Sequence, residues 1–105
     1  MESDRPLRQL LVYLFAGSRG AEMRMRIVLV LASKPANTNE LAEYLGVDYK
    51  AIQYQLDVLL RNRLVQTPNK GDYGALYFLA PNMERNLDYV QEIWNRYGKT
   101  KINRN

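Results

Sequence analysis

The sequence predicts a mainly α-helical domain with one small β-hairpin. Apolar residues recur at helical spacing in five separate segments. Two short β-prone runs, 64–67 and 75–79, flank a connection rich in Pro, Asn and Gly, which is typical of a hairpin. A chain of 105 residues can build one modest core. A single domain over 1–98 is therefore expected, with its core in 18–80 and a basic tail over 99–105.

Apolar stripes define the helices at the start of the chain. The first helix is expected over 7–15, where five apolar residues share one face: Leu7, Leu10, Leu11, Leu14 and Phe15. A second helix is expected over 21–33, with Ile27, Val28 and Leu31 facing inward. Pro35 ends the second helix, because proline disfavours helical geometry in the residue before it.

Capping residues place two further helices close together. Asn37 precedes Glu40 by three residues, the spacing of a capping box, and predicts a short helix that ends at Gly46. Asp48 then caps a helix over 49–62, and the hairpin follows it. The last helix is expected over 82–97. Helix, short helix, tight turn, helix and hairpin, in this order, are the plan of a winged helix-turn-helix.

The stretch from Thr38 to Leu56 resembles the arsenic-repressor-like (ArsR) winged-helix transcription regulators of bacteria and archaea, particularly their archaeal branch. The resemblance covers about 18–80, from the Gly-Ser-Arg-Gly helix entry to the run of apolar residues into the first wing strand. The family usually has glycine before the position of Leu64, but this chain has Arg63, so Asn62 is expected to take the left-handed conformation. The cysteines of the metal-sensing branch are absent, which excludes metal sensing through thiolates.

The composition excludes most enzyme classes. The chain has no Cys and no His, so it has no disulfide, no thiolate metal site and no imidazole base, and we expect neither an enzyme nor a cofactor. The net charge of +4 comes from Arg96 and the tail, because the charges of residues 1–95 cancel. Net charge alone therefore does not predict DNA binding. The polar N-terminus and the lack of a long apolar run predict a cytoplasmic protein that does not span a membrane.

Candidate DNA-binding residues lie on the outward face of the helix over 49–62, which would enter the major groove of double-stranded DNA. They are Tyr49, Lys50, Gln53 and Tyr54. Gln53 can pair with the N6 and N7 edge of adenine, and Lys50 can donate to guanine or to a phosphate. The alternative for the two tyrosines is that they only cover the helix surface.

The hairpin over 65–79 would form the wing, on the DNA backbone or in the minor groove. Asn69 and Lys70 lie in its connection, where contact with phosphate competes with an idle polar loop. Arg24 is a further candidate for a phosphate contact, and a solvated helix face is the alternative for this residue.

The two terminal helices carry more apolar side chains than the small central core needs. Exposure of several such side chains is costly, so we expect the terminal helices to form the interface of a homodimer, as they do in the family that the chain resembles. The alternative is that both helices fold over their own subunit. The expected interface residues are Leu7, Leu11, Leu14, Phe15, Leu87, Val90, Trp94 and Tyr97.

The function predicted from these observations is sequence-specific binding of double-stranded DNA in transcription regulation. Two alternatives stay open: a winged helix that contacts another protein, and a nucleoid-associated protein without sequence preference. The neutral charge of residues 1–95 favours the former. The operator and any small-molecule effector are not indicated by the sequence.

Overall fold

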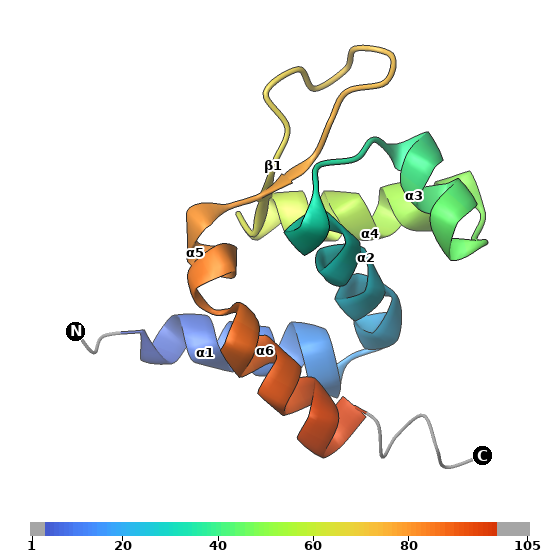
Figure 1. The fold of residues 1–105 in the computed structure, drawn as a ribbon. Coiled ribbons are helices and arrows are strands. Elements are labelled where there is room, and N and C mark those ends of the chain that lie inside the picture. Colours follow the sequence, from blue (N-terminus) through green and yellow to red (C-terminus); the bar gives the residue numbers. More distant parts are fainter. Residues whose placement is uncertain (1–3, 99–105) are drawn as a thin grey trace.

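The helices from the two ends of the chain lie against each other, and the central helices and the hairpin lie beyond them (Figure 1). In this computed structural model, residues 4–98 are described, and the basic tail expected over 99–105 lies outside them. The first terminal segment is α1 (Arg5–Val12), which continues into a π-helical turn, η1 (Tyr13–Gly17). The second is α6 (Leu87–Ile93), followed by the π-helical turn η2 (Trp94–Gly98). The guanidinium of Arg8 lies 5.0 Å from the ring centre of Tyr89, which joins α1 to α6.

The central helices are α2 (Ala21–Ser33), α3 (Thr38–Leu45) and α4 (Tyr49–Arg61). The predicted capping box of α3 is confirmed. The backbone N of Glu40 donates to Oδ1 of Asn37 at 2.8 Å, and the backbone N of Asn37 donates to Oε1 of Glu40 at 2.9 Å. Gly46 has a φ of 68° and permits the tight turn between α3 and α4. Asp48 caps α4 as predicted, because its carboxylate accepts from the backbone N of Lys50 at 3.0 Å.

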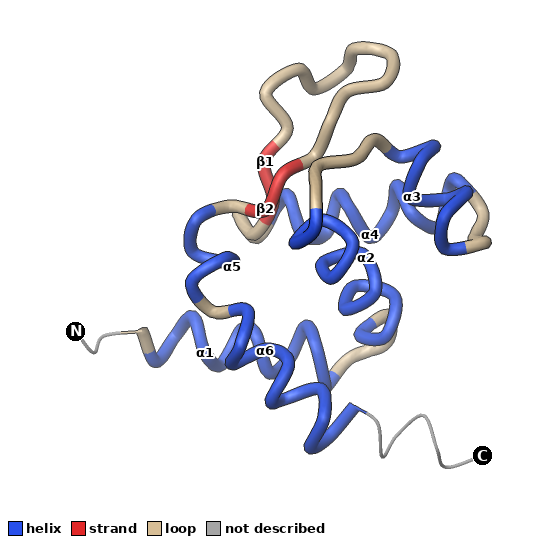
Figure 2. Tube along the Cα trace, viewed as in Figure 1, coloured by secondary structure: helices blue, strands red, loops and turns tan. Residues whose placement is uncertain are grey.

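The wing is a two-stranded antiparallel hairpin with a long connection (Figure 2). Strands β1 (Val65–Gln66) and β2 (Phe78–Leu79) pair with Val65 opposite Leu79. Both strands are shorter than predicted, because the chain turns away from the ladder after Gln66. A third segment joins the hairpin: the backbone N of Tyr77 donates to the carbonyl of Ala36 at 2.8 Å. The wing is thereby fixed to the loop that precedes α3.

The single helix predicted over 82–97 is wrong, because the chain breaks at Asn86. A short helix, α5 (Pro81–Arg85), ends there and α6 begins at Leu87. Asn86 leaves helical geometry with a φ of −108° and a ψ of 14°. Its side-chain amide donates to the carbonyl of Asn82 at 2.8 Å, a local bond that competes with the helical pattern. The break lets α6 turn back along α1.

The left-handed residue after α4 is Arg63, with a φ of 61°, and the prediction of Asn62 was wrong. Asn62 keeps a φ of −95°, and its side-chain amide donates to the carbonyl of Val58 at 2.8 Å. This bond holds Asn62 at the end of the helix, so the reversal falls on the next residue. The backbone N of Leu64 then donates to the carbonyl of Leu59 at 2.9 Å and closes the cap.

The terminal helices pack on the core of their own chain, which corrects four of the predicted interface residues. The side chains of Leu11, Leu14, Phe15 and Val90 are buried in the same apolar cluster as Ile52, Leu56 and Leu59 of α4. They anchor the terminal helices and are not available to a second chain in this conformation. Leu7, Leu87 and Trp94 are half-buried, and Tyr97 is exposed.

Candidate nucleic-acid interface

The first turns of α4 present three of the predicted DNA-binding side chains to solvent. Tyr49, Lys50 and Tyr54 are all exposed, Tyr54 with 61% of its surface. The buried face of the same helix carries Ile52 and Leu56, so the amphipathic pattern sets this orientation. The ammonium group of Lys50 has no hydrogen-bond or ion-pair partner among residues 4–98. These side chains can therefore reach a partner outside the chain.

Gln53 is different, because both ends of its amide are occupied within the protein. Its Oε1 accepts from Oγ1 of Thr38 at 2.9 Å. Its Nε2 donates to Oδ1 of Asp57 at 3.1 Å and to the hydroxyl of Tyr77 at 3.3 Å. Bidentate pairing with adenine needs a free donor as well as a free acceptor. Gln53 must therefore release at least one of its donor bonds before it can read a base in the predicted way.

A cleft of about 330 Å³ lies between the start of α4, the start of α3 and the connection of the wing. Lys70 and Gln53 line it from opposite elements, together with the tyrosines Tyr49, Tyr73 and Tyr77. Asn69 and Lys70 are exposed, and Tyr73 beside them has 97% of its surface in solvent. The backbone N of Asp72 donates to the carbonyl of Asn69 at 3.0 Å and shapes the turn. The helix and the wing thus present their polar side chains on one continuous surface.

Arg24 does not belong to this surface, and its predicted contact with DNA is corrected. Only 3% of the residue is exposed. Its Nε donates to the carbonyl of Leu14 at 2.9 Å, and one terminal nitrogen donates to Oε1 of Gln55 at 2.7 Å. Desolvation lowers the pKa of Arg24 from its ordinary value, while the phenols of Tyr13 and Tyr54 act in the opposite direction. Neither the DNA contact nor the solvated helix face considered for Arg24 fits this burial.

Sequence reasoning missed the polar residues that organise the interface from beneath. Thr38 and Tyr77 are both buried and hold Gln53, and Gln55 holds Arg24. No periodicity marks such contacts, since the partners are 15, 24 and 31 residues apart. One signal was present for Gln55: it lies between Gln53 and Leu56, at the border of the polar and apolar faces of α4.

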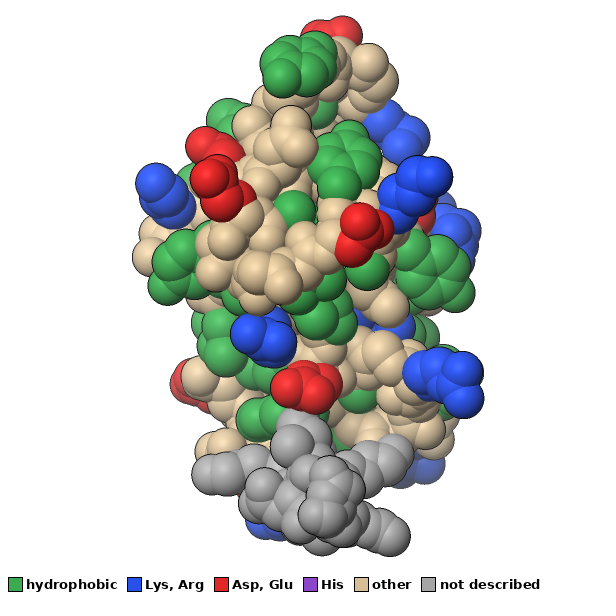
Figure 3. Space-filling model, turned by 90° about the vertical axis from the view of Figure 1, so that its right-hand side faces the viewer, with side chains coloured by type: hydrophobic (Ala, Val, Ile, Leu, Met, Phe, Trp, Pro, Cys, Tyr) green, Lys and Arg blue, Asp and Glu red, His purple; other side chains and the backbone are tan. Residues whose placement is uncertain are grey.

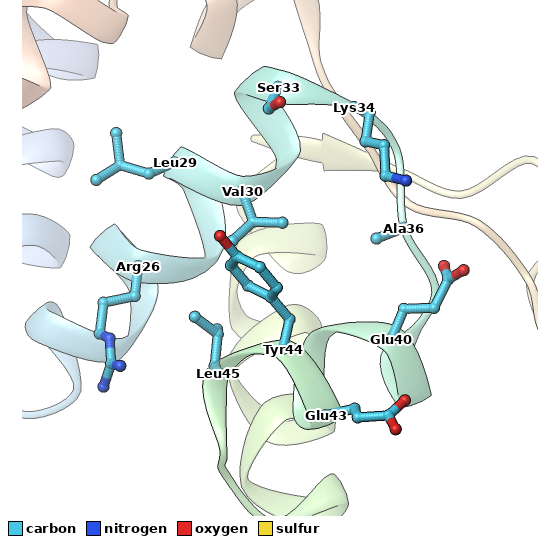
Figure 4. Close-up of a pocket in the computed structure, with 10 residues that line it drawn as sticks. All are labelled: Arg26, Leu29, Val30, Ser33, Lys34, Ala36, Glu40, Glu43, Tyr44 and Leu45. Carbon is cyan, nitrogen blue, oxygen red and sulfur yellow. The ribbon is translucent and has the colours of Figure 1, made fainter.

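A second groove lies elsewhere, between α2 and α3 (Figure 4). This groove of about 690 Å³ shares no lining residue with the cleft beside the wing. Tyr44 lies across it towards Val30, with Arg26 on the α2 side and Glu43 on the α3 side. Its lining combines charged side chains, such as Arg26 and Glu43, with apolar and aromatic ones, such as Leu29 and Tyr44.

Charge is mixed over the face that carries α3 and the turn into α4. Figure 3 shows acidic, basic and hydrophobic side chains interspersed there, without a single basic patch. This face thus carries side chains of both charges, as the balanced charge of residues 1–95 leads us to expect. A broad positive field of the kind that attracts polyanions is therefore not present on this face. No helix of the described residues is long and apolar enough to cross a bilayer.

Comparisons with known proteins agree with this geometry. The family model described as bacterial regulatory protein, arsR family, matches residues 22–67, from α2 to the first wing strand. Reduced HlyU from Vibrio cholerae superposes with a TM-score of 0.64 at 17% identity, over 87% of this chain and 93% of that chain. Diamide-treated YodB from B. subtilis gives a TM-score of 0.66 at 19% identity, over 90% and 93%. A search of curated proteins gives no match.

A third similar structure is a MarR variant from E. coli in complex with operator DNA, with a TM-score of 0.61 and 22% identity, over 87% of this chain and 64% of that chain. The fold and the exposed face of α4 define the class: the chain is a winged helix-turn-helix protein. Over residues 22–67, less than half of the chain, the sequence is similar to the arsR family of bacterial regulatory proteins.

Proposed function

We propose that the chain binds a specific sequence of double-stranded DNA, with α4 as the recognition helix in the major groove. The wing over 65–79 would lie on the backbone or in the adjacent minor groove. The observation that carries this proposal is the shared surface of α4 and the wing, where Lys50 and Lys70 are both exposed. A helix fits the major groove, and two lysines on neighbouring elements can hold its register through phosphates.

The proposed contacts with DNA are of two kinds, contacts with bases and contacts with the backbone. Lys50 donates to guanine or to a phosphate, and Tyr49 and Tyr54 pack on thymine methyl groups or bond the backbone. Asn69 and Lys70 contact the backbone from the wing. Gln53 reads adenine after its amide is released from Tyr77 or Asp57, so its contribution includes the cost of breaking that bond.

The proposal includes a homodimer formed through the terminal helices. A mainly apolar groove of about 420 Å³ lies between η1 and η2, lined by Val12, Ile93 and Tyr97 among others. Tyr97, which lines the groove, is 52% exposed, and Tyr13, the first residue of η1, is 60% exposed. A second copy would remove these aromatic side chains from water. Two recognition helices related by a two-fold axis would then read half-sites about 34–36 Å apart.

The remaining features of the proposal follow from this function. The chain forms one domain over 1–98, in which the core of 18–80 holds the DNA-reading elements. Its place is the cytoplasm, where chromosomal DNA is accessible in a bacterium or archaeon. Membership of the archaeal branch of the family stays a prediction, and so does the identity of any effector.

A protein-contact function is the second candidate, and the groove between α2 and α3 favours it. Leu29 and Tyr44 in this groove are 40% and 77% exposed, so the groove offers apolar and aromatic surface to a partner. A Tyr44→Ala variant distinguishes the two functions. Tyr44 lies outside the proposed DNA-binding surface. If the chain binds DNA through α4, the Tyr44→Ala variant should therefore bind DNA with the affinity of the wild type.

Selection of bound sequences from a random duplex pool at fixed salt tests the proposed function. We expect a near-palindromic sequence, whose affinity falls linearly with salt on logarithmic scales, by about 0.9 per phosphate contact. Specific and random DNA that bind within tenfold of each other would instead indicate a nucleoid-associated protein. Absence of salt-dependent DNA binding would contradict both and leave the protein-contact function.

A further inference from the structure

A buried arginine joins three separate parts of the fold. The guanidinium of Arg24, in the first turn of α2, spans the end of the N-terminal segment, the loop before α2 and the middle of α4. Its Nε donates to the carbonyl of Leu14 in η1 at 2.9 Å. Its two terminal nitrogens contact three further acceptors: Oε1 of Gln55 at 2.7 Å, Oγ of Ser18 at 2.6 Å and the carbonyl of Arg19 at 3.1 Å.

We propose that Arg24 is a positioning residue for DNA binding, which sets the orientation of the recognition helix relative to the terminal helices through Gln55. In a dimer built on the terminal helices, this orientation fixes the distance between the two recognition helices. Arg24 would thereby determine the half-site spacing that the regulator accepts. The inference rests on the proposed function and adds to it a residue that makes no contact with DNA.

The chemistry of the contacts points to geometry as the role of Arg24. All four acceptors are neutral oxygens, so the guanidinium is not there to neutralise a carboxylate. A guanidinium is a planar fork whose donors have fixed directions, so several simultaneous bonds define its orientation and that of its partners. Four bonds to three segments restrict the relative orientation of those segments, because each hydrogen bond has a preferred direction.

Tight packing around Gly20 supports the same role. A Cβ atom at Gly20 would lie 2.8 Å from a terminal nitrogen of Arg24 and 2.8 Å from Nε2 of Gln55. The backbone of the loop therefore closes directly over the Arg24–Gln55 pair. Ser18 extends the connection, because its hydroxyl donates to the carbonyl of Tyr13 at 2.6 Å while it accepts from Arg24. The exposed side chain of Tyr13 belongs to the surface proposed for the dimer.

The half-site spacing that the protein accepts depends on small displacements of the recognition helix. One base pair corresponds to about 3.4 Å along the DNA axis. A modest change in the angle of α4 against the terminal helices is enough to move the recognition surface by that amount. Loss of the Arg24–Gln55 bond should therefore relax the spacing between half-sites while leaving the sequence of each half-site unchanged.

Two variants separate this role from a structural one. Gln55→Met removes the acceptor on α4 but keeps a side chain of similar length, and Arg24 retains its backbone acceptors. Arg24→Lys keeps the charge but loses the planar fork. Gln9→Met on the exposed side of α1 and Arg61→Lys on the last turn of α4 are the matched controls. Thermal unfolding and sedimentation establish which variants are folded dimers, and Gln55→Met keeps the test decisive if Arg24→Lys does not fold.

The experiment is selection from a random duplex pool, followed by affinity measurements on operators with one base pair inserted between the half-sites. Wild type and controls should select one spacing and lose about tenfold or more in affinity on insertion. Gln55→Met should select the same half-sites at mixed spacings, with a loss of about threefold or less on insertion.

Three results would overturn the inference. A folded Gln55→Met dimer with the wild-type spacing and the wild-type penalty shows that the bond does not set the spacing. A folded variant that loses its half-site sequence at every spacing shows a direct contact with DNA instead. A wild-type protein that selects no DNA at all overturns the proposed function itself, and this inference with it.

Discussion

The hydroxyl of Tyr77 lies 3.3 Å from Nε2 of Gln53, so the strand side of the wing and the recognition helix are hydrogen-bonded to each other. Tyr77 is buried and its backbone is bridged to Ala36, in the loop before α3. Gln53 in turn accepts from Thr38 at the start of α3. The wing, the first helix of the motif and the recognition helix therefore meet at one side-chain amide. In the proposed function, the wing and α4 therefore contact the same duplex.

Removal of this hydroxyl tests the relationship. Tyr77→Phe keeps the buried ring and deletes one hydrogen bond, which should cost about 0.5–1.5 kcal/mol of stability. Affinity for the selected operator should rise by up to about tenfold, because Gln53 no longer has to break its bond to Tyr77 before it reads adenine, while affinity for random DNA stays unchanged. Fluorescence anisotropy on both DNAs measures the difference. An unchanged or lower affinity for the operator would contradict the role given to Tyr77.

The wing contributes through charge, according to the proposed function. Lys70→Ala should weaken binding to all sequences alike and lower the slope of log affinity against log salt by about one, because one phosphate contact is lost. The matched control is Arg85→Ala in α5, which removes one positive charge from an exposed position away from the cleft. It should leave the slope unchanged. If both variants lower the slope equally, the effect of Lys70→Ala comes from the loss of a positive charge in general and not from the loss of a phosphate contact.

The left-handed conformation of Arg63 stores a small strain. A residue with a Cβ atom pays about 1–2 kcal/mol at a φ near +60°, and glycine does not. Arg63→Gly should therefore stabilise the protein by about 0.5–1 kcal/mol, less than the full strain because glycine also gains freedom in the unfolded chain. Asn62→Gly, at a φ of −95°, is the control and should destabilise. Urea unfolding of both variants gives the comparison, and a destabilised Arg63→Gly contradicts the assignment of the cap.

The proposed dimer surface can be tested at its most exposed aromatic side chain. Tyr13→Glu places a charge where a second copy would exclude water, and should weaken dimerisation by several kcal/mol. Tyr44→Glu, at a tyrosine that is 77% exposed and lies outside the terminal helices, should leave dimerisation unchanged. Sedimentation equilibrium at micromolar concentration measures both. A wild-type monomer at this concentration would contradict the dimer altogether.

The order of the elements could be predicted from the sequence because each boundary has a local cause. Asn37 with Glu40 begins α3, Gly46 ends it and Asp48 begins α4, and all three act through bonds within a few residues of each other. The exposure of Lys50 followed from the apolar spacing of Ile52 and Leu56 in the same way. Periodicity decides which face of a helix is buried, so it also decides which side chains are free.

The contacts beneath the surface could not be predicted, because they join distant segments. An arginine on α2 has the same appearance in sequence whether it faces solvent or donates to Leu14 and Gln55, as Arg24 does. The occupied amide of Gln53 depends on Tyr77, 24 residues away. The terminal helices do carry an excess of apolar residues, but Phe15 and Val90 are buried in the core of their own chain. The spacing of apolar residues shows which face of a helix is buried, but it does not show which residues that face contacts.

The most direct test of the account is the affinity of a Lys50→Ala, Gln53→Ala double variant for the selected operator, measured beside wild type at one salt concentration. The recognition-helix assignment predicts a loss of about 2–6 kcal/mol in specific binding, since each base contact is worth about 1–3 kcal/mol, while the variant remains a folded dimer. Equal affinity of the two proteins for the operator would contradict the placement of α4 in the major groove.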